Sequence, residues 1–456
     1  MTASKVPPPR HISLRPSLTP TGPLARWQLA RFALGLCLVA LAAAGFAIAF
    51  RSSLTWVLTA ATGARDVVGA MTKLPVPVRF VLPALGGLCA GLLSLSAARF
   101  GSNQGVGDVM EAVVLGRTAL SLRVTLIKSL ASWCAIVSGG SIGREGPLIQ
   151  FGGAIAQFVS KRLSLTTTQT RRLIAAGVAA GFTAAYNTPF SAVLFVLEVV
   201  TGVVVLDAVL PALIATTIAT ALTRASVGEG AIYGQRVFVL HSPLELFAFA
   251  GLAVTAASVA VGFMRLLSFA EEHFRDLPVP LPLRAAFGGL LTGLWLAWLP
   301  EVAGNGYEPL NVLLDGELLP SFVWWLLVGK MMATICTVAS GSPGGVFTPT
   351  LLIGGATGFL YAALLSHVTQ LGSAGGYALV GMAAATAACT HAPLMAAVLV
   401  FELSGDYAIV LPLVLATAIA TLVSRRLRRE SIYAAELKRR GIAWELTFEG
   451  RRLISR

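Results

Sequence analysis

An arginine and a glutamate stand side by side in the glycine-rich segment SGGSIGREGPLIQFGGA, residues 138–154, in a strongly apolar part of the chain. They are Arg144 and Glu145, and Pro147 follows two residues later. Ionisable residues at membrane depth are costly and mark functional sites. Proline is well suited to the start of a helix, whose free amides and positive dipole end attract anions. We therefore expect the Glu145 carboxylate to occupy an anion's place and to gate it, leaving when it swings away or is protonated.

A second segment repeats this pattern. SGSPGGVFTPTLLIGGA at 340–356 aligns with the first segment without a gap, with seven identities in seventeen, and places Pro349 opposite Pro147. Two such loops would aim two helix N-termini at one point, which favours an anion site. For one loop alone, packing glycines before a helix-starting proline would be the simpler interpretation. For Glu145 the alternative is a first-turn glutamate that only stabilises its helix, by about 0.3–1 kcal/mol at a surface.

The composition predicts the setting of these loops. The 456 residues are 56% hydrophobic and 12% charged, with mean hydropathy +0.78, which leaves too little polar surface for a water-soluble protein. The net charge of +13 is concentrated at the two ends of the chain rather than interleaved with aromatic residues, so we expect no nucleic-acid partner. The five cysteines are single and show no metal or disulfide spacing, and we expect no metal and no cofactor.

The repeat extends over most of the chain. Residues 187–198 match 391–402, and 210–224 match 411–425 with eight identities in fifteen. Basic residues at both ends indicate that both termini lie in the cytoplasm, and the segment that joins the copies, about 225–243, has no basic cluster and is expected on the outer side. Each copy would then cross the membrane an odd number of times, so we expect the copies to be inverted. We expect an all-α polytopic membrane protein of two inverted repeats with tilted, broken helices. The expected division is a disordered basic tail (1–30), repeat 1 (31–226), repeat 2 (244–433) and a short basic tail (434–456).

Four motifs connect the chain to a known family. GREGP (143–147), YNTPFSAVLFVLE (186–198), GGVFTP (344–349) and SIY (431–433) stand in the order and spacing of the CLC chloride channels and chloride/proton exchangers. The chain resembles this family from about residue 30 to 440, and most of all its bacterial ClcB-type branch. The resemblance implies a homodimer with a pore in each subunit, surrounded by lipid in a prokaryotic inner membrane. The permeant ligand would be chloride or another small monovalent anion.

The resemblance also implies site residues. Glu145 would be the gate, the backbone amides of Val346 and Phe347 would hold the central anion, and the Tyr433 hydroxyl would donate to it from the cytoplasmic side. Without the family, Tyr433 would be interpreted as a surface residue on a basic helix. The full set of implied anion-binding residues is Gln104, Gly105, Gly146, Val346, Phe347 and Tyr433.

Two departures from the family pattern bear on function. The family loop GSGIP here reads NQGVG, with Gln104 in place of serine and Gly107 in place of proline, which puts selectivity for chloride in question. Exchangers carry a second glutamate after the position of Glu198, but here it is Val199. We therefore expect channel-like or uncoupled anion permeation, with coupled chloride/proton antiport as the alternative. An intramembrane enzyme using Glu145 as acid or base would need a catalytic partner that the sequence does not offer.

Two further expectations concern packing. Glu198 has a counterpart, Glu402, in the second repeat, which suggests a helix-end role for both. The apolar segments 188–224 and 392–425 match each other and, as in the family, are expected to form the dimer interface.

Overall fold

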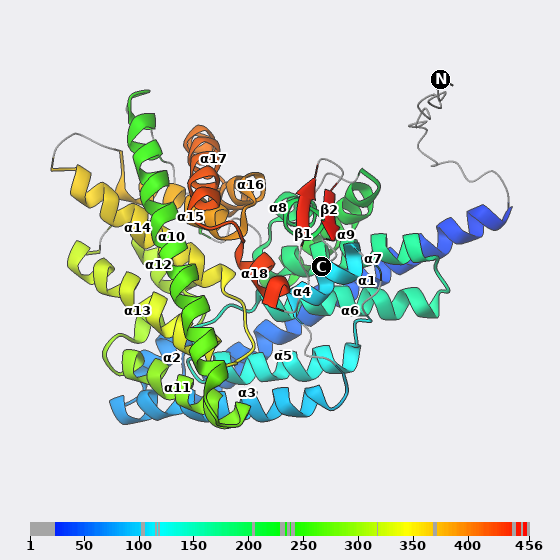
Figure 1. Ribbon diagram of the computed structural model, residues 1–456, viewed down its shortest axis with the longest axis horizontal. Helices are drawn as coiled ribbons and strands as arrows, with labels where there is room; N and C mark the ends of the chain where they lie inside the picture. The colour runs from blue at the N-terminus through cyan, green and yellow to red at the C-terminus, as the bar shows by residue number, and fades with distance from the viewer. Residues whose placement is uncertain are drawn as a thin grey trace, which may run out of the picture.

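Helices form almost the whole protein, and Figure 1 shows the later ones (α10 to α15) on the left and the earlier ones (α6 to α9) on the right. The computed structural model describes residues 23–101, 105–114, 116, 119–202, 206–228, 233, 234, 238, 242–316, 318–367, 372–439, 444–447 and 450–453. The first half contains α1 (Pro23–Thr62), α2 (Val67–Lys73), α3 (Val76–Ala98), α4 (Val106–Val114), α5 (Leu122–Val137), α6 (Glu145–Arg162), α7 (Thr167–Tyr186), α8 (Pro189–Leu194), the π-helix η1 (Phe195–Thr201) and α9 (Leu206–Val227). The second half contains α10 (Glu245–Asp276), α11 (Leu281–Trp298), the 3-10 turn η2 (Pro300–Val302), α12 (Tyr307–Leu314), α13 (Pro320–Ala339), α14 (Phe347–Leu365), α15 (Ala374–Thr390), α16 (Pro393–Ser404), α17 (Val410–Leu427) and α18 (Ile432–Arg439). An antiparallel hairpin of β1 (Trp444–Thr447) and β2 (Gly450–Leu453) follows.

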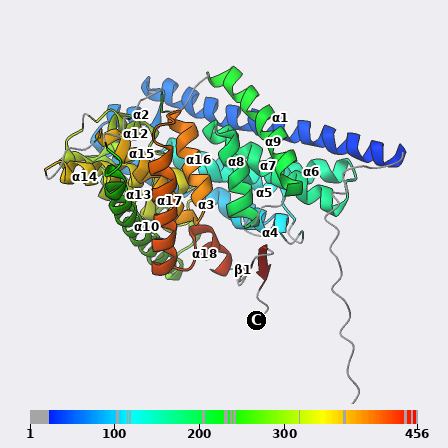
Figure 2. The same ribbon diagram turned by 90° about the horizontal axis from the view of Figure 1, so that it is seen from above.

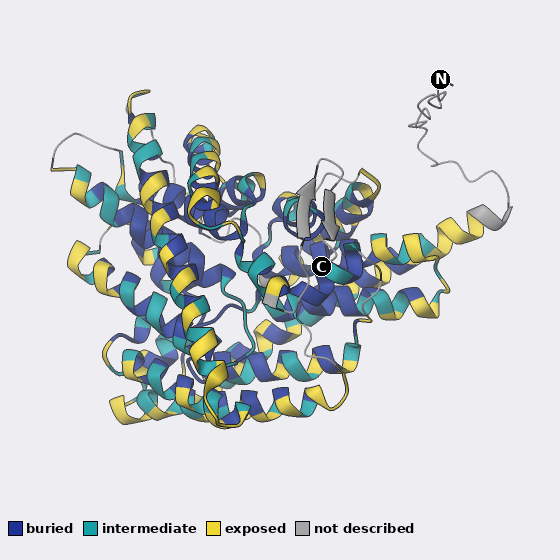
Figure 3. Cartoon of the chain, viewed as in Figure 1, coloured by how far each residue is buried: buried dark blue, intermediate teal, exposed yellow. Residues whose placement is uncertain are grey.

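The helices suit a lipid environment. Seven helical segments among the described residues are long and apolar enough to cross a membrane, and the chain is a multi-pass membrane protein, as its composition predicts. Figure 3 shows buried positions concentrated at the centre and exposed ones along the outer helices. Large apolar side chains such as Leu34, Leu38 and Leu41 of α1 are exposed on that outer surface, where lipid would cover them.

The two repeats pack in the same way. Helices α6 and α7 of the first repeat touch through Gly152 and Gly177: a Cβ on Gly152 would lie 2.0 Å from the Gly177 carbonyl oxygen. The matching helices α14 and α15 touch through Gly354 and Gly381, where a Cβ on either would lie 2.4 Å from the other's carbonyl oxygen. Small residues allow this close approach, which holds helices together where no hydrophobic effect can. The predicted repeat is therefore present in the packing as well as in the sequence.

A pair of corresponding helices joins the two halves. Helices α3 and α11 lie side by side along the lower edge of Figure 1. A Cβ on Gly289 of α11 would lie 2.1 Å from the Pro83 carbonyl oxygen, and one on Gly87 of α3 would lie 2.3 Å from that of Ala285. The contact is reciprocal, because each helix offers a glycine to the backbone of the other.

The two glutamates at the broken helices exchange partners between repeats. Glu402 of α16 accepts hydrogen bonds from the backbone amides of Phe190 (3.1 Å) and Ser191 (2.7 Å) in α8. Glu198 of η1 accepts from the amides of Leu394 (3.3 Å) and Met395 (2.7 Å) in α16. Each acid thus satisfies amides that a helix start leaves without an intrahelical partner. The helix-end role expected for both glutamates is confirmed.

The two ends of the chain hold more structure than the sequence predicts. Helix α1 begins at Pro23, so the range 1–30, expected to be a disordered tail, is helical from that residue onwards, while 1–22 lie outside the described residues. The range 434–456, expected as a tail, contains most of α18 and a hairpin in which Trp444 pairs with Leu453. Figure 2 places α18 and β1 at the edge opposite α2.

Candidate functional site

The two glycine-rich loops meet in the middle of the protein. The Gly143 amide donates to the Gly345 carbonyl (2.7 Å) and the Gly345 amide to the Gly143 carbonyl (2.9 Å), which makes an antiparallel bridge between the repeats. The loops therefore run in opposite directions, as inverted copies require. Each leads directly into a helix, α6 or α14, so both helix starts lie at this bridge.

The helix starts differ from the prediction in one detail. The helices begin at Glu145 and Phe347, so Pro147 and Pro349 occupy third rather than first positions. Those positions still lie within the first turn, where an amide has no partner inside the helix and proline costs nothing. The acid itself is thus the first residue of α6.

Glu145 reaches across the bridge to the other repeat. Its Oε1 accepts from the backbone amides of Phe347 (2.9 Å) and Thr348 (3.3 Å), and its Oε2 accepts from the Thr348 hydroxyl (2.9 Å). The side chain is 2% exposed. Sequence reasoning placed the carboxylate at the positive end of α6, but the structure places it at that of α14. It occupies the position that an anion would take at a helix N-terminus.

Glycines make room for this carboxylate. A Cβ on Gly143 would lie 2.0 Å from Oε2 of Glu145, and a Cβ on Gly345 would lie 2.0 Å from Oε1. Any larger residue at either position would displace the acid. The glycines that form the bridge are therefore also the walls of the Glu145 pocket.

Most of the residues expected at the site lie together. Gly105, Glu145, Gly146, Val346 and Tyr433 line one cavity of about 400 Å³. The Phe347 amide reaches Glu145 at 2.9 Å. The Tyr433 side chain is buried, so the family-based expectation for it is favoured over a surface position.

Two residues expected at the site, Gln104 and Gly105, directly precede α4 in the sequence. The Gly105 amide donates to Oδ2 of Asp108 (2.7 Å), so in this structure it serves the start of α4 rather than an anion. Gln104 lies outside the described residues. Gly107, which stands where the family has proline, is buried in α4, and a Cβ on it would lie 3.3 Å from the Leu437 side chain of α18. Glycine here lets α18, which carries Tyr433, approach α4 closely.

Charged residues line part of the cavity. Lys128, Arg284 and Arg428 line it together with Glu271 and Glu436. Cationic side chains in a cleft raise the local concentration of anions. The cavity thus offers an approach to the Glu145 carboxylate from the side of α18.

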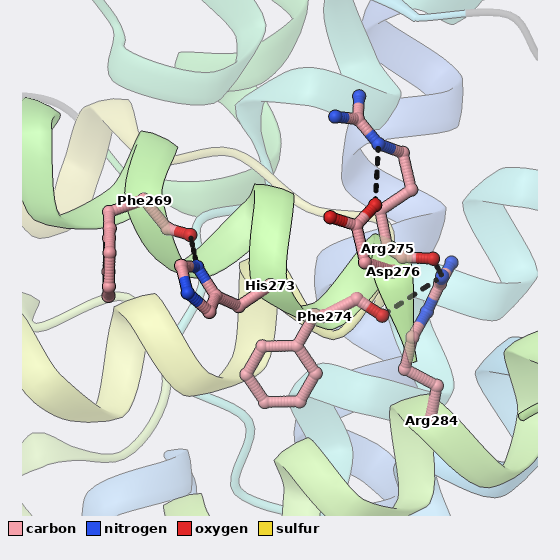
Figure 4. A network of polar contacts seen from close by, with 6 residues as sticks. All are labelled: Phe269, His273, Phe274, Arg275, Asp276 and Arg284. Atoms are coloured by element: carbon pink, nitrogen blue, oxygen red, sulfur yellow. Dashed lines mark hydrogen bonds and ion pairs between the residues drawn. The ribbon is translucent and has the colours of Figure 1, made fainter. Parts of the chain in front are cut away.

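The position of Arg284 shows how one of these charges is fixed. Its Nη1 donates to the carbonyls of Phe274 (3.3 Å) and Arg275 (3.4 Å) at the end of α10, as Figure 4 shows, and its Nε donates to Ser340 (3.3 Å). A cation at a helix C-terminus is favoured by the free carbonyls and the negative dipole end there. Arg284 therefore joins α10, α11 and the loop before α14.

Arg144 points to a different partner from Glu145. Its guanidinium lies 5.6 Å from the centroid of the Tyr307 ring, a cation–π contact with the start of α12. From the sequence alone, Arg144 could either pair structurally or add positive potential at the site, and this geometry shows a structural contact.

Sequence reasoning missed two hydroxyl groups at the site. Thr348 donates to Glu145, and its Oγ1 lies 2.9 Å from the hydroxyl of Tyr186, the last residue of α7. Both residues stand inside the motifs GGVFTP and YNTPFSAVLFVLE, directly beside positions that were considered. The sequence signal was the threonine hydroxyl directly after Phe347, but only the fold brings Tyr186 to it.

The valine at the position where exchangers carry a second glutamate is buried in the apolar core. Val199 lies in the π-helix η1 and is 1% exposed. Glu198, next to it, is held at the start of α16 as described above. A π-helical turn inside a helical segment is often found at functional sites.

The fold and these two facing helix starts define a membrane transport protein with an acid placed between its repeats. The chain belongs to the CLC family: residues 86–425 match the family of voltage gated chloride channels. The protein is accordingly a CLC-family chloride transport protein and not an enzyme.

Relatives of known name support this assignment. The chain is 36% identical to a ClcB-like chloride channel protein of Ralstonia nicotianae over 410 residues, covering 88% of this chain and 95% of the relative. It is 34% identical over 379 residues to the voltage-gated ClC-type chloride channel ClcB of Escherichia coli, covering 81% of this chain and 89% of that one.

Solved structures share the fold. A slow cyanobacterial Cl⁻/H⁺ antiporter superposes with a TM-score of 0.77 at 24% identity, covering 90% of this chain and 98% of the other. A CLC-type fluoride/proton antiporter superposes with a TM-score of 0.76 at 23% identity, covering 91% and 98%. The all-α fold of two inverted repeats is confirmed by these structures.

Proposed function

We propose that the protein is a chloride pathway gated by Glu145, channel-like or uncoupled, with one pore in each subunit of a homodimer. One observation carries the proposal: the Glu145 carboxylate accepts hydrogen bonds from the backbone amides of Phe347 and Thr348 at the start of α14. A carboxylate and a chloride ion compete for the same donors, so the path is closed while the acid stays and open when it leaves. Phe347, Val346, Gly146 and Tyr433 would hold the anion that replaces it.

The setting of this pathway follows from charge and relatives. We place the protein in a prokaryotic inner membrane, because the relatives named above are bacterial. Both termini lie in the cytoplasm on this proposal, because the basic residues are concentrated at the two ends of the chain. The cavity lined by Arg284, Arg428 and Tyr433 is then the cytoplasmic entrance.

Val199 separates this proposal from coupled chloride/proton antiport. Coupling requires a proton to reach Glu145 from the cytoplasm by a route apart from that of the anion, and a buried valine carries none. Glu198 is the neighbouring residue, but its carboxylate accepts hydrogen bonds from the amides of Leu394 and Met395. Protons can still reach Glu145 from outside, so opening would depend on external pH without exchange.

The test is chloride flux from liposomes with and without a pH gradient. We expect an outward chloride gradient to drive no uphill proton movement when valinomycin and potassium hold the voltage at zero. Glu145→Ala liposomes serve as the uncoupled control, and empty liposomes give the leak. A reversal potential displaced from the chloride equilibrium value by an imposed pH gradient would show antiport and overturn the proposal.

A further inference from the structure

Two hydroxyl groups form a chain that leads away from the Glu145 carboxylate. Oε2 of Glu145 lies 2.9 Å from Oγ1 of Thr348, and that oxygen lies 2.9 Å from the hydroxyl of Tyr186. All three side chains are buried. They come from the start of α6, the start of α14 and the end of α7, so the chain ties both repeats together at the gate.

The direction of these hydrogen bonds follows from the chemistry of the groups. An ionised carboxylate can only accept, so the Thr348 hydroxyl must donate to it. The hydroxyl has a single proton, so its oxygen accepts from Tyr186 in turn. The order Tyr186 to Thr348 to Glu145 is therefore set while Glu145 is charged. A protonated Glu145 would itself become a donor and would no longer need this order.

Tyr186 is held in place by aromatic neighbours. Its ring centroid lies 4.8 Å from that of Phe182, 5.5 Å from that of Phe347 and 6.5 Å from that of Tyr307. The helix ends directly after it at Asn187, whose backbone is left-handed with φ 58°. A side chain confined in this way keeps its hydroxyl directed at Thr348.

This series of hydrogen bonds exists at only one of the two helix starts. At the constant offset of the repeat, Thr348 corresponds to Gly146, which has no side chain. The start of α14 therefore offers the gate a side-chain donor besides its two backbone amides, and the start of α6 has no equivalent.

We propose that the Thr348 hydroxyl is a latch that holds the ionised Glu145 gate closed, and that Tyr186 is the positioning residue that directs it. This inference rests on the gating role of Glu145 proposed above. The backbone amides can bind either a chloride ion or a carboxylate. The Thr348 hydroxyl adds a bond that the ionised acid makes in the closed state and loses on leaving. The latch thus sets how easily protonation or chloride opens the path.

Other titratable groups also lie near the gate. Buried near the gate are Tyr186 of α7, Tyr307 of α12, Tyr433 of α18 and Lys330 of α13. Lys330 is fixed by hydrogen bonds to the carbonyls of Val302 (3.0 Å) and Gly304 (2.7 Å). Tyrosines keep their protons through the neutral range. Glu145 is therefore the carboxyl group in this set whose titration would open the path.

The experiment compares chloride efflux from liposomes between pH 4.5 and 7.5 for a set of variants. Thr348→Val removes the hydroxyl and keeps the shape, and should raise efflux at pH 7.5 by about tenfold, since a bond to a charged group is lost. The midpoint of the pH profile should move up by about one unit, the equivalent of tenfold. Tyr186→Phe should act in the same direction with about a third of the effect, because the latch loses only its positioning bond. Thr348→Ser keeps the hydroxyl and should keep the wild-type midpoint of the pH profile.

The matched control is Thr357→Val. Thr357 lies on the same helix and is buried, but its hydroxyl donates to the carbonyl of Ile353 (2.8 Å) in its own helix. We expect its pH profile to match the wild type. Each variant is first checked for a single symmetric peak in size-exclusion chromatography. Should Thr348→Val fail this check, Tyr186→Phe provides the same test, because it leaves the start of α14 unchanged.

Repeating Thr348→Val in a Glu145→Ala background separates the two proposals. Without the Glu145 carboxylate the Thr348 hydroxyl has no gate to bind. Glu145→Ala and the double variant should therefore show the same flat pH profile and efflux within about twofold of each other. Equal acceleration by Thr348→Val in both backgrounds would mean that the hydroxyl acts on the anion, and would overturn the latch. A wild-type profile for Thr348→Val and Tyr186→Phe, with a flat profile for Glu145→Ala, would also overturn it and leave the gate intact. A Glu145→Ala profile that still depends on pH would instead remove the gate itself.

Discussion

At the residue scale, the protein depends on one carboxylate that makes three hydrogen bonds to the opposite repeat. Glu145→Gln removes its charge and almost none of its volume. An amide binds the donors of Phe347 and Thr348 less strongly than a carboxylate does, because hydrogen bonds to ionised groups are about twice as strong. We expect chloride efflux at pH 7.5 to rise by about tenfold or more and to lose its pH dependence.

Efflux from liposomes at several external pH values measures this, with Glu272→Gln as the control. Glu272 is an exposed glutamate of α10, and its loss should leave the pH profile as it was. A well-folded Glu145→Gln protein without any chloride flux would count against the gate.

The same residue shows what the sequence could and could not predict. Glu145 was predicted from its glycine-rich loop and the proline that follows it, whereas Val346, Phe347 and Tyr433 were predicted from the resemblance to the CLC family. The acid's partners were not, since residues 202 and 203 positions away meet it only after the loops have formed their antiparallel bridge. The direction of a side chain across such a bridge depends on packing on both sides. Thr348 and Tyr186 were missed for this reason, although both stood in quoted motifs.

At the scale of elements, broken helices need caps, and the repeats supply them to each other. Glu402 and Glu198 each accept hydrogen bonds from two backbone amides at the start of a helix in the other repeat. The sequence predicted a helix-end role from the matching positions alone. It could not show that each acid caps the other repeat's helix, because that depends on how the inverted halves interlock.

This exchange makes a symmetric prediction. Glu402→Ala and Glu198→Ala should each lower the free energy of unfolding by about 1–3 kcal/mol, since each leaves two helix-start amides without their acceptor. Glu402→Gln should cost less, because one acceptor oxygen remains. The measurement is the temperature at which half the protein stays monodisperse in detergent, with the exposed Glu272→Ala as control. Equal stability of wild type and both alanine variants would refute the capping role.

At the scale of the whole molecule, the apolar outer surface must meet either lipid or a second subunit. Exposure alone does not separate these, because lipid-facing helices are apolar too. The repeat provides the distinction. Phe190 of α8 and Leu394 of α16 are matching positions and are 63% and 56% exposed, and Leu210 of α9 and Leu411 of α17 form another exposed matching pair. A surface built twice from the same pattern is suited to a two-fold contact in which both subunits use the same face.

We therefore expect a homodimer that buries the outer faces of α8, α9, α16 and α17. With a subunit mass of 47.5 kDa, light scattering in mild detergent should give a protein mass of about twice that value.

Ile214→Trp combined with Leu411→Trp puts two bulky side chains into this face and should shift the protein to the monomer, because overpacked contacts are destabilised. Leu34→Trp combined with Leu38→Trp, on the exposed face of α1, is the matched control and should leave the mass unchanged. Each subunit contains both loops, Glu145 and the cavity, so the monomeric variant should keep pH-dependent chloride flux. A wild-type protein that is monomeric at every detergent concentration would show that lipid covers this face instead.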